Sequence, residues 1–367
     1  MKILHVVGAR PNFMKVAPVW KAVEEKTTFQ QIMVHTGQHY DVNMSDVFFS
    51  DLDIPTPGYY LGVGSGSHAQ QTAAIMVAFE KVLLETRPDL VLVYGDINST
   101  IAAALVCSKL MFPVAHVEAG LRSFDRTMPE EINRLLTDQI ADILFTPSPD
   151  GNENLLREGI APEKIHLVGN VMIDSLVRLQ PMAKKSTILE TLNLQSGEYA
   201  VLTLHRPSNV DNDTILQDLL NGLDSLSQRL PIIFPVHPRA RESISRYISS
   251  MINHNLQLIE PLNYLDFLRL MSSARMILTD SGGIQEETTY LGIPCLTLRS
   301  NTERPITVEM GTNTLVGQDM ELLTSRFNAL LEDDTTWDRR PPRGILLWEG
   351  NAAKRIVNVL NLWYDKP

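Results

Sequence analysis

The chain has 367 residues, of which 44% are hydrophobic and 20% charged, an ordinary globular composition that predicts two domains of about 150–190 residues each. Its formal net charge of −11 argues against binding to nucleic acid or to an anionic membrane, so an anionic ligand would need a local cluster of arginine and lysine. The two cysteines predict no disulfide framework, and we recognise neither a signal peptide nor an apolar run of membrane-spanning length, so we expect a cytoplasmic protein.

Short apolar runs rich in β-branched residues alternate with amphipathic segments along the chain. Such runs are typical of strands buried on both faces, and helices between them make right-handed crossovers between parallel strands. We therefore predict an α/β fold with two doubly wound domains. The predicted strands are residues 2–7, 31–36, 89–94, 113–117, 142–146 and 165–168 in the first half, and 199–204, 231–236, 257–260, 276–280, 294–298 and 313–316 in the second.

The two sets of strands place the domain boundary near Gly169. We predict domains at 1–170 and 171–349, and the amphipathic C-terminal helix 350–367 can pack back onto the first domain. Ligands of open parallel sheets bind at the carboxyl ends of the strands. We therefore expect the two domains to face each other across a cleft lined by the residues that follow the strands.

The first predicted strand is followed by Gly8-Ala9-Arg10-Pro11, which is neither the dinucleotide fingerprint Gly-x-Gly-x-x-Gly nor a Walker-type loop. Two cations lie here, Arg10 at the turn and Lys15 in the predicted helix. The position of Arg10 at a strand end, before a proline, favours a functional role over a plain surface charge. We predict no bound cofactor, and no metal, because histidine and cysteine lack ligand spacing.

Three acidic positions lie near neighbouring strand ends in the first half. Asp96 and Glu118 each come just after a predicted strand, and Glu130 opens a predicted helix together with Glu131. Asp96 alone is explained by an N-cap, and the two glutamates by complementation of the helix dipole. Carboxylates brought close together, however, raise one another's pKa and provide a protonated acid beside an ionised base. The grouping therefore indicates proton transfer.

The second half places histidine and arginine at strand ends. His205 follows one predicted strand and His237 follows the next one. A histidine there can be an acid or a cation that faces a phosphate. Arg304 lies in the loop after strand 294–298, where a guanidinium suits bidentate binding of oxygen anions.

A strand, a turn and a helix start meet at Ser281-Gly282-Gly283. Glycine lets backbone N–H groups approach a phosphate, serine adds a hydroxyl, and a helix N-terminus contributes about half a positive charge. Glu287, one turn later, can reach the hydroxyls of a ribose. A plain capped turn is the alternative, but with the other strand ends this junction predicts binding of a nucleotide diphosphate. Nucleotide-sugar chemistry follows, with glycosyl transfer and epimerisation as the leading reactions.

The chain resembles the non-hydrolysing UDP-N-acetylglucosamine 2-epimerases nearly from end to end. This resemblance implies two Rossmann-like domains in the glycosyltransferase B arrangement, a homodimer, UDP-sugar and UDP as ligands, and a role in polysaccharide biosynthesis. The motifs that carry it are Gly-Ala-Arg-Pro at 8–11, His-Thr-Gly-Gln-His at 35–39, Gly-Asp at 95–96, His-Val-Glu-Ala-Gly-Leu-Arg at 116–122, Pro-Glu-Glu-Ile-Asn-Arg at 129–134, Thr-Leu-His-Arg at 203–206, Thr-Asp-Ser-Gly-Gly-Ile-Gln-Glu-Glu at 279–287 and Thr-Glu-Arg-Pro at 302–305.

The resemblance implies reversible epimerisation at C2 of UDP-GlcNAc to give UDP-ManNAc, through elimination of UDP to a 2-acetamidoglucal and its re-addition. It makes Asp96, Glu118 and Glu130 the acid/base carboxylates, and it lets His205 favour departure of the diphosphate. Phe267 matches the position that stacks on uracil. The substrate-binding residues implied are Arg10, Lys15, Arg134, His237, Leu262, Phe267, Ser281, Gly282, Gly283, Glu287 and Arg304.

Three departures from the family pattern leave the exact function open. Asn12 replaces the acidic residue that is usual at this position. The segment Gly-Ala-Arg-Pro followed by an amide and Phe is similar to that of relatives that act on UDP-2,3-diacetamido-2,3-dideoxyglucuronate. The sequence therefore leaves open which substituents the sugar carries at C3 and C6. Pro207-Ser208 replaces a more polar pair, and residues 41–45 lack the pattern of members activated by their own substrate. The sequence also leaves open a hydrolysing 2-epimerase, a UDP-sugar glycosyltransferase and a non-catalytic UDP-sugar sensor.

Overall fold

The computed structural model describes residues 1–38, 52–236, 255–333 and 344–365, together with 241 and 244. The chain divides into two compact units, which we call the first unit (Met1–Ser175 with Leu346–Pro367) and the second unit (Leu176–Ile345). No helix in the described part of the chain is long and apolar enough to cross a membrane.

The first unit is built on a sheet of seven parallel strands in the order β3-β2-β1-β4-β5-β6-β7. The order reverses between β1 and β4, which is the switch point where open sheets of this type bind ligands. The strands are β1 (Lys2–Val7), β2 (Gln30–His35), β3 (Tyr59–Tyr60), β4 (Leu90–Tyr94), β5 (Val114–Val117), β6 (Ile143–Thr146) and β7 (Ile165–Leu167).

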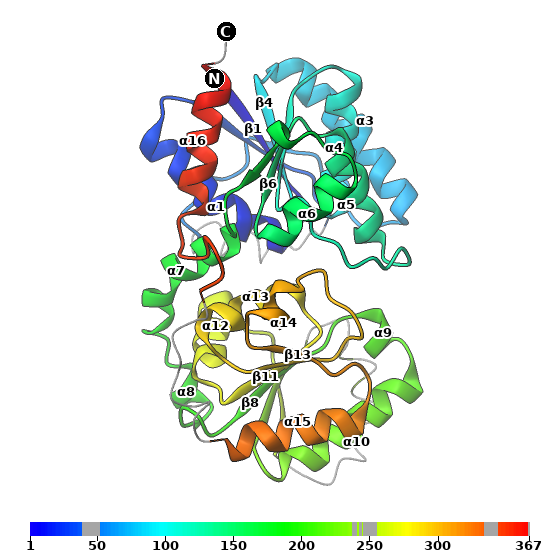
Figure 1. The fold of residues 1–367 in the computed structure, drawn as a ribbon, viewed down its shortest axis with the longest axis vertical. Coiled ribbons are helices and arrows are strands. Elements are labelled where there is room, and N and C mark those ends of the chain that lie inside the picture. Colours follow the sequence, from blue (N-terminus) through cyan, green and yellow to red (C-terminus); the bar gives the residue numbers. More distant parts are fainter. Residues whose placement is uncertain (39–51, 237–240, 242–243, 245–254, 334–343, 366–367) are drawn as a thin grey trace. The chain divides into compact units, whose positions relative to one another are not determined.

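Helices cover both faces of this sheet (Figure 1). Helices α1 (Arg10–Lys26) and α16 (Ala352–Tyr364) pack together on one face, and α3 (His68–Thr86), α4 (Asn98–Lys109) and α5 (Pro129–Ile140) lie side by side on the other. The sequence explains the burial, because β4 is the continuous apolar run Leu-Val-Leu-Val-Tyr and all five of its residues are buried. Each buried Leu or Val side chain stabilises the fold by about 1.5–3 kcal/mol. The described part of the first unit also contains α6 (Pro149–Arg157), the short 3₁₀ helix η1 (Pro162–Lys164) and the start of α7 (Val171–Ala183).

Helix α16 is fixed to the first unit by Asp174, which lies on α7 (Val171–Ala183). The Asp174 carboxylate accepts hydrogen bonds from the backbone N–H groups of Ala352, at 3.0 Å, and Ala353, at 2.7 Å. These are the first two residues of α16, whose N–H groups have no partner within the helix. Burial raises the pKa of Asp174 to about 6, although both hydrogen bonds oppose this effect.

The second unit repeats the design with six parallel strands in the order β10-β9-β8-β11-β12-β13. Helices α10 (Asp213–Ser227) and α15 (Met320–Glu332) pack together on one face of the sheet, whereas α12 (Tyr264–Ser273) and α13 (Gly282–Leu291) lie on the other (Figure 1). The other elements are β8 (Ala200–Thr203), β9 (Ile232–Pro235), β10 (Leu256–Ile259), β11 (Met276–Thr279), β12 (Cys295–Thr297), β13 (Asn313–Leu315), α8 (Ile188–Thr191), α9 (Pro207–Val210) and α14 (Ile306–Glu309).

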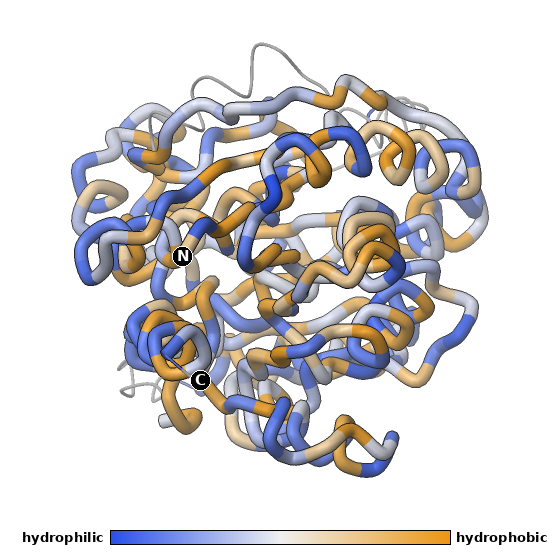
Figure 2. Tube along the Cα trace, turned by 90° about the horizontal axis from the view of Figure 1, so that it is seen from above, coloured by the Kyte–Doolittle hydropathy of each residue, from blue (hydrophilic) through white to orange (hydrophobic). Residues whose placement is uncertain are grey.

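The colouring by hydropathy in Figure 2 shows helices that carry both apolar and polar residues. In α16, for example, Ala352, Ala353, Ile356, Val357 and Leu360 are buried. Their spacing of three and four residues puts them on one face of the helix. One apolar face on each covering helix and an apolar sheet together form the core of each unit.

The predicted α/β class and the two doubly wound parallel sheets are confirmed. Each of the twelve predicted strands coincides with an observed one to within one or two residues at either end. The strand β3 was not predicted, because its two residues, Tyr59 and Tyr60, are too few to show a periodic pattern.

Candidate active site

The switch point of the first unit gathers polar side chains from three elements. Lys15 on α1 forms an ion pair with Glu118, which directly follows β5, and both side chains are buried. Gly95 follows β4 with a φ of +63°, and a Cβ there would lie 2.7 Å from the Lys15 ammonium nitrogen. Glycine at this position therefore leaves room for the ion pair. Glu118 itself has a φ of +79°, a conformation that costs about 1–3 kcal/mol in a residue with a side chain.

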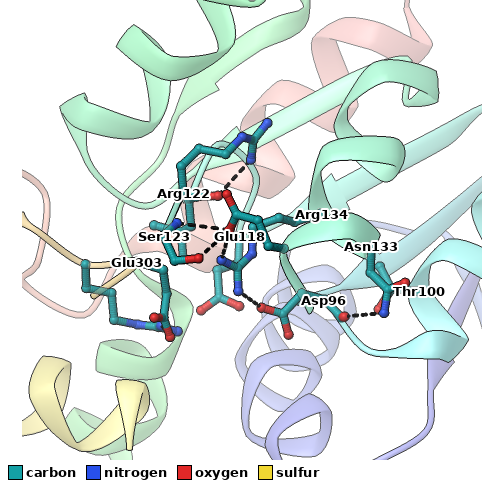
Figure 3. A network of polar contacts seen from close by, with 12 residues as sticks. Asp96, Thr100, Glu118, Arg122, Ser123, Asn133, Arg134 and Glu303 are labelled. Atoms are coloured by element: carbon teal, nitrogen blue, oxygen red, sulfur yellow. Dashed lines mark hydrogen bonds and ion pairs between the residues drawn. The ribbon is translucent and has the colours of Figure 1, made fainter. Parts of the chain in front are cut away.

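Asp96 is held from α5 by two residues (Figure 3). Nη2 of Arg134 lies 2.5 Å from Oδ2 of Asp96, and Nδ2 of Asn133 donates to the Asp96 carbonyl at 2.9 Å. The Asp96 side chain is 26% exposed, so it is anchored and still accessible. Asp96 does not cap α4, because the N-cap of that helix is Ile97.

The two neighbouring glutamates of α5 have different environments. Glu131 is buried and accepts hydrogen bonds from the N–H of Ser123 (2.9 Å), the hydroxyl of Ser123 (2.9 Å) and the N–H of Phe124 (3.0 Å). It also pairs with Nη1 of Arg134 at 2.6 Å. Glu130 is half-buried and makes no hydrogen bond or ion pair with the rest of the described chain. The carboxylate of Glu131 therefore stabilises the fold through its partners, whereas the carboxylate of Glu130 has no such partner among the described residues.

Three buried polar side chains, His116, Arg122 and Asp138, contact one another near the ends of β4 and β5. Nε2 of His116 is 2.8 Å from the Gly95 carbonyl, and Nδ1 is 2.7 Å from Asp138. Burial opposes ionisation of Asp138, but the charges of His116 and Arg122 and their hydrogen bonds outweigh it, and its pKa is lowered. The two ring nitrogens of His116 thus connect the turn at Gly95 to Asp138 on α5.

Asn12 is used inside the first unit. Its Oδ1 accepts from the N–H groups of Gly8 and Ala9, both at 3.1 Å, and its Nδ2 donates to the Tyr94 carbonyl at 2.8 Å. The side chain is buried. An amide can both accept from Gly8 and Ala9 and donate to Tyr94, whereas an ionised carboxylate can only accept, so the amide of Asn12 suits these three backbone partners.

The second unit places an arginine against the start of α13. Nη1 of Arg304 donates to Glu303 at 2.5 Å, and its Nε forms an ion pair with Glu286 at 2.8 Å. A Cβ on Gly282 would overlap both the Arg304 guanidinium and the Glu303 carboxylate. Ser281 is the N-cap of α13 but makes no side-chain capping bond, so its hydroxyl is not used by the helix.

The remaining predicted residues of the second unit lie on α12, α13 and the loops beside them. Glu287 is buried on α13 and accepts a hydrogen bond from the Tyr264 hydroxyl at 2.6 Å. Phe267 lies on α12, and Leu262 lies two residues before the start of α12. Both side chains are half-buried. Gly283 is the second residue of α13.

His205 follows β8 and lies beside Asp280, which follows β11. Nδ1 of His205 is 2.8 Å from Oδ1 of Asp280. The His205 side chain is 47% exposed, whereas Asp280 is fully buried. The two strands are neighbours in the sheet, which explains why residues 75 positions apart meet.

The predicted residues thus form one group in each unit. The group of the first unit lies at the ends of β1, β4 and β5 and contains Lys15, Asp96, Glu118 and Arg134. Glu130 lies in the first turn of α5, and Arg10 is exposed at the start of α1. In the second unit His205, Ser281, Gly282 and Arg304 surround the ends of β8 and β11. His237 lies outside the described residues, as do residues 41–45. Within the described ranges we find no group of three or more His, Cys, Asp or Glu able to hold a metal ion.

Comparison with known proteins identifies the family. The sequence model of the family described as UDP-N-acetylglucosamine 2-epimerase matches residues 21–361. The chain belongs to this epimerase family. It is therefore an isomerase of nucleotide-sugar chemistry, and the predicted family resemblance is confirmed.

Relatives within the epimerase family match the chain over its full length. A Methanococcus maripaludis protein named UDP-N-acetylglucosamine 2-epimerase homolog is 47% identical over 98% of this chain and 99% of its own. The UDP-2,3-diacetamido-2,3-dideoxy-D-glucuronate 2-epimerase of Pseudomonas aeruginosa is 42% identical, again over 98% of this chain and 99% of its own. The crystal structure of the Methanocaldococcus jannaschii UDP-GlcNAc 2-epimerase in complex with UDP-GlcNAc and UDP is 43% identical and has a TM-score of 0.90, covering 99% of this chain and 100% of that one.

Reasoning from the sequence missed the roles of Glu131, His116 and Asp280. All three lie inside the epimerase motifs, so the signal was present as residue identity. What the sequence lacked was the partner of each side chain. The hydrogen bonds of Glu131 and the contact of Asp280 with His205 join residues that only the fold brings together.

Proposed function

We propose that the protein catalyses the reversible C2 epimerisation of UDP-N-acetylglucosamine to UDP-N-acetylmannosamine. Membership of the epimerase family supports the reaction type. The M. jannaschii enzyme, with which UDP-GlcNAc and UDP were crystallised, supports the choice of substrate. The observation that carries the proposal is that Asp96 and Glu118 are held by ion pairs at neighbouring strand ends of the first unit, while α5, which supplies the partner of Asp96, carries Glu130 in its first turn.

The proposed reaction avoids direct formation of a carbanion, because the C2 proton of the sugar is not acidic. A base removes the C2 proton, the C2–H electron pair forms the C1=C2 double bond, and the C1–O pair leaves with the diphosphate. The intermediates are UDP and a 2-acetamidoglucal. For the return step an acid delivers a proton to the opposite face of C2, and a diphosphate oxygen of UDP attacks C1. Atoms and electrons balance without an oxidant, so this route needs no bound cofactor.

Asp96, Glu118 and Glu130 are the proposed acid/base groups. Proton transfer of this kind needs groups held within hydrogen-bonding distance of the reacting proton. Arg134 fixes Asp96 and Lys15 fixes Glu118, which gives both carboxylates defined positions. Glu130 has no partner in the described structure, so its oxygens are available to a sugar.

The second unit supplies the proposed UDP site. Arg304, Ser281 and the first N–H groups of α13 combine positive charge with donors that suit phosphate oxygens. Glu287 is the proposed acceptor of ribose hydroxyls, in exchange for its hydrogen bond to Tyr264. Phe267 is the proposed stacking partner of uracil. The cleft expected between the two units stays a prediction.

Epimerisation of UDP-2,3-diacetamido-2,3-dideoxyglucuronate is the second candidate. The P. aeruginosa enzyme of that name is nearly as similar to this chain as the M. jannaschii one. The sequence clue for this candidate was the amide at Asn12, but both ends of that amide bind backbone groups of the first unit. Asn12 is therefore fully used by the fold and gives no support to either substrate.

Proton NMR in D2O tests the proposal directly. The purified protein is incubated in parallel with UDP-GlcNAc and with the diacetamido-uronate, and the C1 and C2 resonances are followed. UDP-ManNAc with deuterium at C2, together with deuterium in the remaining UDP-GlcNAc, is the expected result. Turnover of the uronate alone would transfer the proposal to the second candidate. Free UDP with N-acetylmannosamine would instead indicate a hydrolysing enzyme, and loss of signal only with an added sugar acceptor would indicate a glycosyltransferase.

We extend the proposal to a homodimer in the cytoplasm. Both follow from the family resemblance, and light scattering and cell fractionation are the corresponding measurements. A monomer at micromolar concentration, or recovery with a membrane fraction, would contradict this extension without touching the chemistry.

A further inference from the structure

The Asp280 carboxylate accepts hydrogen bonds from three different residues. It lies after β11, is fully buried, and accepts from the backbone N–H groups of His205 (3.1 Å to Oδ1, 3.0 Å to Oδ2) and Arg206 (2.9 Å). Nδ2 of Asn209 donates a further hydrogen bond at 3.1 Å. The same carboxylate therefore holds the backbone of the β8–α9 turn and contacts the His205 ring.

The contact with Asp280 fixes the position of one hydrogen on His205. Nδ1 faces Oδ1 of Asp280 at 2.8 Å, and an ionised carboxylate can only accept, so Nδ1 carries a hydrogen. Nε2 has no partner among the described residues, and the ring is about half exposed. A neutral His205 therefore has a bare Nε2, and a protonated one presents an Nε2–H group.

The charges around His205 support ionisation of Asp280. Burial alone would raise the pKa of Asp280, but the hydrogen bond and charge of His205 and the two backbone N–H groups outweigh it, and the pKa is lowered. Three arginines of the second unit form ion pairs with Glu303. Nη2 of Arg206 lies 3.6 Å from a Glu303 oxygen, and Arg299 and Arg304 lie closer, at 2.7 and 2.5 Å. The cationic charge of those arginines is therefore shared with Glu303, and none of these ion pairs involves the Asp280 carboxylate.

We infer that Asp280 is a positioning residue for His205, which it holds in the Nδ1–H form and whose imidazolium it stabilises, so that Nε2–H points to an anionic ligand. The inference rests on the proposed function, in which His205 faces the diphosphate. There the Nε2–H group donates a hydrogen bond to the oxygen that leaves C1, and no bond to His205 forms or breaks. A carboxylate that orients a histidine and stabilises its charged form is an established device of enzyme active sites.

The first test uses the unmodified protein and needs no activity. Two-dimensional ¹⁵N NMR of the imidazole rings reports which nitrogen carries the hydrogen, and a His205→Gln variant identifies the His205 signals among the nine histidines. Above the titration midpoint of His205 we expect the Nδ1–H tautomer, the opposite of the form that free imidazole side chains prefer. An Nε2–H tautomer would overturn the inference.

The second test removes the charge and keeps the shape. Asp280→Asn still accepts hydrogen bonds from the turn through Oδ1, but it no longer stabilises a cation. In this variant the amide Nδ2 faces Nδ1 of His205, so we expect the neutral ring to change to the Nε2–H tautomer in the ¹⁵N spectrum. We also expect kcat to fall by about 10–100-fold with KM nearly unchanged.

Asn209→Ala is the matched control. It removes the hydrogen bonds that Asn209 donates to Asp280 and to the Leu298 carbonyl and the one that it accepts from Gln318, but it keeps the Asp280 charge. We expect a lower Tm with the Nδ1–H tautomer of His205 and kcat retained. If both variants lower Tm and neither changes the tautomer or kcat, Asp280 is only structural and the inference fails. The correct tautomer without turnover of any UDP-sugar would instead leave this inference standing and refute the proposed function.

Discussion

Glu130 and Glu131 are neighbours in the sequence, yet we expect opposite results when each is changed to glutamine. Glu131→Gln removes a buried charge that pairs with Arg134 and receives three hydrogen bonds from Ser123 and Phe124. Loss of one partner from a buried ion pair costs about 3–5 kcal/mol. In a unit of this size, 1 kcal/mol lowers Tm by about 2–4 °C. We therefore expect Glu131→Gln to lower Tm by about 6–20 °C.

Glu130→Gln should behave in the reverse way. Its side chain has no hydrogen bond or ion pair within the described structure, so the free energy of unfolding should change by no more than about 0.5 kcal/mol. Loss of an acid/base group, by contrast, slows the chemical step by about 10²–10⁴-fold. The stable variant should therefore be the inactive one.

Both quantities are measured on the same preparations. Differential scanning calorimetry gives Tm, and NMR of UDP-GlcNAc turnover gives kcat, at a temperature well below the Tm of Glu131→Gln. A Glu130→Gln variant with the wild-type rate would refute its role in proton transfer. A Glu131→Gln variant with unchanged Tm would refute the structural assignment of Glu131.

Asp174 has a pKa of about 6 in the folded chain, above the value of about 3.9 expected when unfolded, so its contribution to stability is complete below about pH 4 and is lost as the pH rises through 6. Urea unfolding between pH 4 and 7 should show this loss in the wild type and a weaker dependence in Asp174→Asn. Gly282→Ala should displace the Arg304 guanidinium, and we expect it to weaken UDP binding by about tenfold, or about 1.4 kcal/mol. Isothermal titration calorimetry measures the Kd, and an unchanged Kd would exclude Arg304 from the phosphate site. Asn12→Asp should lose the bond to the Tyr94 carbonyl and destabilise the protein by about 1–3 kcal/mol at pH 7, with a smaller loss at pH 4, where the protonated acid can donate.

The fold could be predicted from the sequence because parallel strands buried on both faces give unbroken apolar runs. The run Leu90-Val91-Leu92-Val93-Tyr94 is one of these, and the strand appeared within one residue of its predicted range. The positions of Asp96 and Glu118 followed from the same argument, since residues after parallel strands meet at one edge. A strand of two residues, such as β3, leaves no comparable pattern.

The direction of individual side chains could not be predicted in the same way. Successive residues of a helix differ in direction by about 100°, so Glu130 and Glu131 face different surroundings although they have the same chemistry. Asn12 shows the same limit, because an amide near a predicted ligand site was interpreted as a sign of substrate choice. Its partners are Gly8, Ala9 and Tyr94, of which Tyr94 is brought close only by the sheet.

The attachment of α16 to α1 and Asp174 has a consequence for folding during synthesis. The second unit is continuous in sequence, whereas the first is completed by a helix translated after it. At about 5–20 residues per second, the ribosome needs roughly ten seconds or more to pass through the second unit. For that interval the carboxylates that we propose to be catalytic belong to an incomplete domain, in which the face of α1 that binds α16 is uncovered. The unit that carries the proposed UDP site is thus free to mature first on the ribosome, and chaperones would find their binding surface on the nascent first unit.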